Sequence, residues 1–178
     1  MQESVITSQN ESGYQSSNIH QATGSRDIKV IEFIIESQPF AINLFDTKEV
    51  INCQEITLIP NSPSYIRGIT NLRGVITSVI DIKNLLSINS EKTDQKKKDR
   101  IIILDPSICQ KPIGILVDDV RSVQNYSPHE IDIHESSSDH YQKGVIKRSY
   151  QDLMGKDISE LILLLDVKKI VQNINLDW

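Results

Sequence analysis

The stretch PNSPSYIRGITNLRG, residues 60–74, is the part of the sequence that decides the fold. It packs two prolines, two glycines and two arginines into a short segment between apolar runs. Proline restricts the backbone and glycine reaches conformations closed to other residues, so the stretch predicts defined turns. It contains no histidine, cysteine or carboxylate from which an active site could be built. We therefore interpret it as a shaped contact surface.

The sequence on both sides of this stretch predicts an all-β fold with few helices. The chain contains 29 isoleucines but only 3 phenylalanines and 1 tryptophan, and a core rich in β-branched residues favours strands. Strands of about five residues recur with turn signals between them, a pattern typical of small barrels or sandwiches. We also expect a short helix at residues 47–51 capped by Asp46, a helical turn at 64–66 ended by Gly68, and a terminal helix at 167–174.

Composition excludes several classes of function. The net charge is −5, which argues against a protein that binds nucleic acid through its phosphates. Cys53 and Cys109 form no CxxC motif and are expected to be free thiols of a cytoplasmic protein. No apolar run is long enough to span a bilayer, and the start of the chain does not have the pattern of a signal peptide. Residues 1–27 are mostly Ser, Gln, Asn, Thr and Gly, and we expect a disordered tail there.

A search for catalytic chemistry gives no positive signal. The sequence lacks a phosphate-binding loop, a nucleophile elbow and a HExxH motif, so we predict no enzymatic activity and no cofactor. One alternative is a small β-domain that binds a metal through His129, His134 and His140. These histidines are separated by four and five residues, which is not a compact ligand spacing, and an exposed acidic loop explains them as well.

Two charged residues occupy constrained positions. Glu49 lies in the short helix predicted at residues 47–51, and Arg73 lies in a turn beside Gly74. An arginine held by a rigid backbone is a common interface anchor, but it can equally form a structural salt bridge, for instance with Glu49 itself. Spacing alone leaves both alternatives open.

Four motifs give the chain a resemblance to a known family. They are TKEVI (47–51), PNSPSYIRGITNLRGVITSVIDI (60–82), GILVDDV (114–120) and LILLLDVKKIV (161–171). In this order they resemble CheW-like coupling proteins. The resemblance implies two intertwined five-stranded SH3-like barrels over residues 28–172, with residues 173–178 as the C-terminal end.

The resemblance also implies a function and a set of partner-binding residues. Proteins of this family are non-enzymatic adaptors that bridge the cytoplasmic tip of methyl-accepting chemotaxis receptors and the regulatory domain of the histidine kinase CheA. The matching positions in this chain are Glu49, Gly68, Asn71 and Arg73, and Val50 and Ile69 are expected to contribute to the contact as their apolar neighbours. The resemblance implies a cytoplasmic protein recruited to membrane receptor arrays without inserting into the bilayer. A coupling protein of the same fold in a pilus-motility or other non-flagellar pathway is an alternative.

Overall fold

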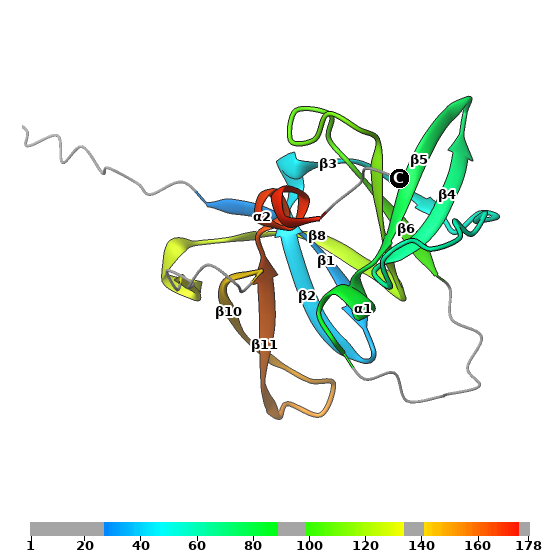
Figure 1. The fold of residues 1–178 in the computed structure, drawn as a ribbon. Helices are drawn as coiled ribbons and strands as arrows, with labels where there is room; N and C mark the ends of the chain where they lie inside the picture. The colour runs from blue at the N-terminus through cyan, green and yellow to red at the C-terminus, as the bar shows by residue number, and fades with distance from the viewer. Residues whose placement is uncertain (1–26, 89–98, 134–140, 175–178) are drawn as a thin grey trace, which may run out of the picture.

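A computed structural model describes residues 27–88, 99–133 and 141–174 (Figure 1). Residues 1–26 of the predicted tail, residues 89–98, His134 and His140 lie outside these ranges. Within them, no helix combines the length and the apolar character needed to cross a bilayer.

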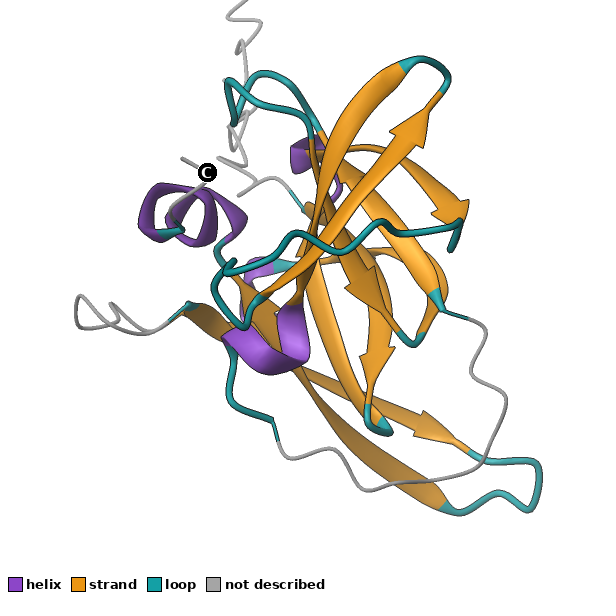
Figure 2. Ribbon diagram, turned by 45° about the vertical axis from the view of Figure 1, so that its right-hand side comes forward, coloured by secondary structure: helices purple, strands orange, loops and turns teal. Residues whose placement is uncertain are grey.

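The described residues form two β-sheets, and the chain passes from one to the other and back (Figure 2). The first sheet has the order β8-β1-β2-β11-β10-β9, and the second has the order β3-β6-β7-β5-β4. The strands of the first sheet are β1 (Ile28–Ile35), β2 (Gln38–Asn43), β8 (Asp119–Tyr126), β9 (Ile131–Ile133), β10 (Gln142–Gln151) and β11 (Asp157–Leu165). Those of the second are β3 (Thr47–Asn52), β4 (Ile66–Leu72), β5 (Val75–Asp81), β6 (Arg100–Leu104) and β7 (Ile113–Val117). The all-β prediction is confirmed. The first sheet has six strands, where the resemblance implied five, and the second sheet has five, as implied.

Short helices connect or cover the sheets. They are η1 (Leu44–Asp46), α1 (Ile82–Leu85), η2 (Pro128–Glu130) and α2 (Val167–Asn173). The predicted terminal helix is confirmed as α2, whose first turn is capped by Asp166 through Lys169 N at 3.1 Å. Val167 and Ile170 are fully buried, so α2 is held by its apolar face.

One hydrophobic core joins the two sheets. Phe33 and Ile42 of the first sheet belong to the same buried cluster as Ile102 and Ile115 of the second. Beside this core, Lys83 of α1 binds Glu36 at 2.9 Å and Asp118 at 2.5 Å. Glu36 closes the β1–β2 hairpin, so this partly buried ion cluster links the first sheet to the helix that follows β5. The sheets therefore form one folding unit.

The predicted helix at residues 47–51 is wrong, because this segment is strand β3. Asn43, not Asp46, caps the preceding turn by accepting a hydrogen bond from Phe45 N at 2.9 Å. Burial alternates along β3, with Glu49 half-buried and Lys48 and Val50 exposed. Pairing with β6 supplies the hydrogen bonds that a helix of this length would have had to make internally.

The predicted helical turn at residues 64–66 is a single turn, closed by a hydrogen bond from Ile66 N to Pro63 O at 2.8 Å, and it does not continue to Gly68. Strand β4 starts at Ile66, so Gly68 lies inside a strand and does not end a helix. It has φ +146° and sits where the β4–β5 register shifts. A Cβ at this position would lie 2.2 Å from the carbonyl oxygen of Thr57. Gly68 thus permits the close approach at which Thr57 and Ile69 exchange hydrogen bonds of 2.8 and 2.9 Å.

Candidate functional site

The two charged residues singled out in the sequence meet in the structure. Arg73 lies in the β4–β5 turn and Glu49 on edge strand β3, and their side chains form a two-pronged ion pair. Arg73 Nη2 lies 3.0 Å from Glu49 Oε2, and Nη1 lies 3.4 Å from Oε1. The Arg73 side chain is 76% exposed and that of Glu49 23%. An exposed pair of this kind contributes about 0–1 kcal/mol to stability, so folding alone gives little reason for it.

Backbone geometry fixes the direction of Arg73. Arg73 has φ +52° and Gly74 has φ +89°, the pattern of a two-residue type I′ hairpin turn. Asn71 Oδ1 accepts a hydrogen bond from Gly74 N at 2.8 Å, which locks the turn from the strand side. The Asn-Leu-Arg-Gly turn therefore fixes the position from which the Arg73 side chain extends.

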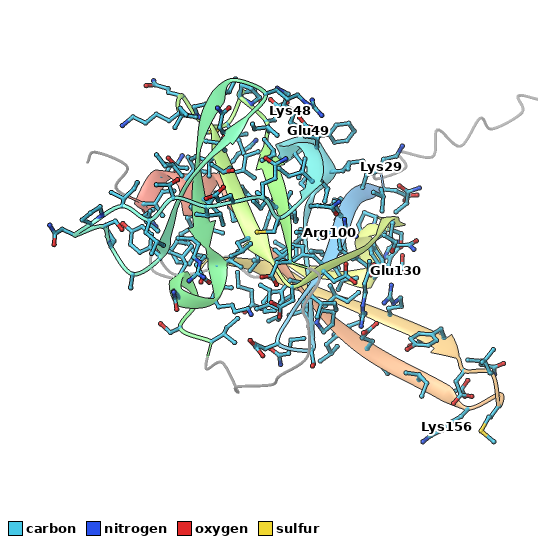
Figure 3. All side chains as sticks on the ribbon, turned by 90° about the vertical axis from the view of Figure 1, so that its right-hand side faces the viewer. Lys29, Lys48, Glu49, Arg100, Glu130 and Lys156 are labelled. Atoms are coloured by element: carbon cyan, nitrogen blue, oxygen red, sulfur yellow. The ribbon has the colours of Figure 1, made fainter. Side chains whose placement is uncertain are left out.

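An apolar groove of about 220 Å³ opens beside the ion pair. We call it the Arg73 groove. It is lined by buried Leu72, Ile103 and Leu104, by Val75, Pro106, Cys109 and Pro112, and by the charged residues Lys48, Glu49, Arg73 and Lys111. Figure 3 shows Lys48 and Glu49 together at this end of the molecule. Apolar lining with a few fixed polar groups is the composition of a recognition site.

The loop at residues 105–112 forms one wall of the groove, and sequence reasoning missed it. Ser78 N donates to Pro112 O at 3.0 Å, and β5 runs parallel to β7, so the loop is held against β5. In the sequence Asp105-Pro106 and Lys111-Pro112 predict a turn, but only the parallel pairing of β5 with β7 places that loop beside Arg73.

The titratable groups Asp105 and Cys109 of this loop have structural roles. Hydrogen bonds from Ser107 hold the pKa of Asp105 below its usual value. Burial raises the pKa of the Cys109 thiol, so it stays protonated and is no activated nucleophile. Cys53 and Cys109 are both free, as the sequence predicted.

The other predicted contact residues are distributed unevenly around this site. Asn71 takes part by fixing the turn. Val50 is exposed but follows Glu49 on a strand, so its side chain points to the opposite face. Gly68 and Ile69 lie further along β4, at the bridge to Thr57. The structure thus brings Glu49, Asn71 and Arg73 together and leaves the other three apart.

A second charged cluster lies in the first sheet and is internal. Glu32 is fully buried and accepts from Tyr126 Oη at 2.5 Å and from Arg148 Nη1 at 2.9 Å. Arg148 also binds Glu160, which in turn binds Arg121 at 2.7 Å. Both carboxylates of this network, Glu32 and Glu160, are paired, and the cluster ties β1, β8, β10 and β11 together.

The described ranges contain no group of three or more His, Cys, Asp or Glu placed to hold a metal ion. The histidine alternative rests on His134 and His140, outside the described residues. No cofactor site is proposed.

Comparison with known proteins identifies the family of this chain. Its residues 29–175 match the CheW-like domain family. The chain belongs to the CheW-like family. Chemotaxis protein CheW of Thermotoga maritima is 28% identical over 156 residues, which cover 86% of this chain and 93% of the relative. Chemotaxis protein CheW of Bacillus subtilis is 33% identical over 120 residues, covering 67% and 69%.

A solved structure agrees with this assignment. The crystal structure of the scaffolding protein TtCheW from Thermoanaerobacter tengcongensis matches with a TM-score of 0.62 and 27% identity, over 78% of this chain and 88% of that one. The CheW-like chain is therefore a non-enzymatic chemotaxis adaptor, in agreement with the sequence prediction.

Proposed function

We propose that this CheW-like adaptor couples the cytoplasmic tip of methyl-accepting chemotaxis receptors to the histidine kinase CheA, and is recruited in this way to membrane receptor arrays. We further propose that Arg73 and Glu49 belong to the receptor contact. The observation that carries the second proposal is the ion pair itself, mounted on a locked turn beside an apolar groove.

Physical reasoning supports a contact role for Arg73. The pair adds little to stability, yet the turn holds the guanidinium in one direction and leaves it 76% exposed. Arginine offers a planar fork of donors and is enriched among residues that dominate interface energies. Val50, Gly68, Ile69 and Asn71 remain predicted contact residues, with Gly68 and Asn71 acting through the backbone they shape.

The test is a reconstituted kinase assay with a receptor cytoplasmic fragment and CheA. The wild-type chain should co-sediment with both proteins and stimulate CheA autophosphorylation. Arg73→Glu should weaken coupling by about 2 kcal/mol, roughly 30-fold in affinity, with an unchanged unfolding transition.

Lys147→Glu is the matched control. Lys147 is 63% exposed and pairs with Asp132 at 3.4 Å on strands β10 and β9, and neither residue lines the groove, so its reversal breaks another exposed ion pair without touching the site. A wild-type chain without effect on the kinase would reject the coupling role. Wild-type coupling by Arg73→Glu would reject only the role of Arg73.

A further inference from the structure

A second hollow, of about 390 Å³, lies where β11 ends and α2 begins. Figure 1 shows α2 at this end of β11. Lys143 of β10 and Lys168 and Lys169 of α2 line the hollow together with the carboxylates Asp46 and Asp166, and we call it the lysine pocket. It shares no lining residue with the Arg73 groove, so the proposed receptor contact does not account for it.

A β-bulge determines where Lys143 lies. The register between β10 and β11 shifts between Gln142 and Gly144, which makes Lys143 the extra residue of the bulge. Gly144 permits this path close to β9, because a Cβ there would lie 2.6 Å from the carbonyl oxygen of Asp132. A bulge interrupts the regular alternation of side chains and changes the direction of the one it carries. At this bulge the Lys143 side chain lines the pocket.

The two carboxylates of the pocket already have structural roles. Asp166 Oδ1 caps α2 by accepting a hydrogen bond from Lys169 N at 3.1 Å, and Asp46 pairs with Lys168 Nζ at 3.8 Å. Lys143 has no ion-pair partner in the part of the chain that the structure describes. The ammonium groups therefore exceed the carboxylates by one positive charge, and one anionic group would balance the pocket.

The remaining lining residues suit an anion that also has an apolar part. Asn43 and Gln172 carry side-chain amide groups, which donate hydrogen bonds to anionic oxygens. Ile28, Leu164 and Leu165 add an apolar wall, and both leucines are almost fully buried. Apolar walls with a few converging polar groups are the composition of a small-molecule site.

We propose that the lysine pocket binds a phosphate ester that carries a single negative charge. Lysine ammonium groups bind phosphate as point charges and can approach it from several directions, which suits a tetrahedral group better than a planar carboxylate. A phosphodiester carries one negative charge, which equals the excess positive charge of the pocket. Soluble esters and the headgroups of phospholipids both present this group.

Titration of the full chain with dimethyl phosphate, a minimal phosphodiester, is the first measurement. Two-dimensional amide spectra should show shifts at Asn43, Lys143 and Gln172 with a Kd of about 1–10 mM, as expected for so small a ligand. Acetate has the same charge but a planar shape, and it should bind roughly 10-fold more weakly. The site does not depend on the proposed function and is tested without any other protein.

Three substitutions assign the binding to Lys143. Lys143→Gln removes the cation without an ion-pair partner and should weaken binding of dimethyl phosphate roughly 10-fold. Lys143→Arg keeps the charge and should stay within about threefold of wild type. Lys147→Gln is the matched control, because Lys147 lies on the same strand but does not line the pocket, and it should bind like wild type. Circular dichroism and thermal unfolding check that each variant is folded.

Vesicles distinguish the two sources of the ester. Sedimentation with phosphatidylglycerol vesicles that is lost in Lys143→Gln supports a lipid headgroup, and binding of dimethyl phosphate without sedimentation supports a soluble ester. The proposal is overturned if the pocket amides do not shift at about 50 mM dimethyl phosphate. It is equally overturned if acetate binds as tightly, or if folded Lys143→Gln and Lys147→Gln bind dimethyl phosphate with the same affinity.

Discussion

Arg73 occupies a backbone conformation that suits another residue better. The first position of a type I′ turn favours Asn or Gly, and a non-glycine residue at φ +52° costs about 1–2 kcal/mol. The ion pair with Glu49 returns at most about 1 kcal/mol of this. The position is therefore poorly explained by stability and well explained by a need for the guanidinium.

Replacing Arg73 with glycine should separate stability from coupling. Arg73→Gly relieves the turn and loses the exposed ion pair, so the free energy of unfolding should stay equal or rise by up to about 1 kcal/mol. Coupling in the kinase assay should nevertheless fall as it does for Arg73→Glu. Arg73→Asn, which tolerates the same backbone, should behave alike. Urea unfolding gives the stability, and a glycine variant with full coupling would show that the side chain makes no contact.

Tyr126 makes stability depend on pH in the alkaline range. Burial, followed by its hydrogen bond to Glu32, raises the pKa of Tyr126 from 10.0 to about 12. Between these values the unfolded chain releases the phenolic proton while the folded chain keeps it, so this contribution to stability is complete below pH 10 and is lost as pH rises toward 12. The loss amounts to roughly 2–3 kcal/mol over that window.

Tyr126→Phe isolates this effect from other alkaline titrations. The variant lacks the proton and the hydrogen bond to Glu32, so it should be less stable than wild type at pH 8. Its difference from wild type should then shrink as pH rises through the window. Urea unfolding of both proteins at several pH values measures this, and a constant difference would mean that Tyr126 does not titrate there.

At the scale of elements, the two glycines of the β4–β5 hairpin do different work. Gly74 needs a positive φ but has open space around a Cβ, whereas a Cβ at Gly68 would lie 2.2 Å from Thr57 O and 2.8 Å from Ile56 Cγ2. Gly74→Ala should cost about 1 kcal/mol, for the backbone alone. Gly68→Ala should cost roughly 2–4 kcal/mol, because the strand must also move away from Thr57.

Amide exchange distinguishes the two costs. In Gly68→Ala the amides of Thr57 and Ile69, which close the bridge, should lose protection locally. In Gly74→Ala the amides of Thr57 and Ile69 should lose only as much protection as the global loss of stability explains. Equal destabilisation by the two substitutions would contradict a steric role for Gly68.

Element type was predictable where the pattern was long, and failed where it was short. The isoleucine-rich strands and α2 follow from periodicity and capping. Residues 47–51 carry both a helix signal, Asp46 before Lys48 and Glu49, and the alternation of a strand. Pairing with β6 decides between them, and β6 lies some fifty residues away in the sequence. The prediction that Gly68 ends a helix fails for a similar reason, because the carbonyl that excludes a side chain there belongs to Thr57, in another segment of the chain.

At the scale of the whole molecule, the candidate site forms because segments that are distant in the sequence pair in the second sheet. The sequence motifs named Glu49 and Arg73, and the resemblance to coupling proteins suggested a shared role. Sequence spacing leaves an ion pair between them as one of two alternatives, and it does not predict the groove beside them. It exists because the parallel pairing of β5 with β7 brings the loop 105–112 to the β4–β5 turn. Non-local pairing of this kind leaves no local sequence signal.

The passage of the chain between the two sheets predicts that they unfold together. Ile102 of β6 is fully buried in the core shared by both sheets, whereas Ile146 of β10 is fully buried in a cluster confined to the first sheet. Each substitution to alanine should cost about 2–5 kcal/mol. If the chain is one cooperative unit, both variants should lower the amide protection of β1 and of β7 by the same amount, with equal calorimetric and van't Hoff enthalpies. Loss of protection confined to the first sheet in Ile146→Ala would show that the shared core and the Lys83 ion cluster do not couple the sheets.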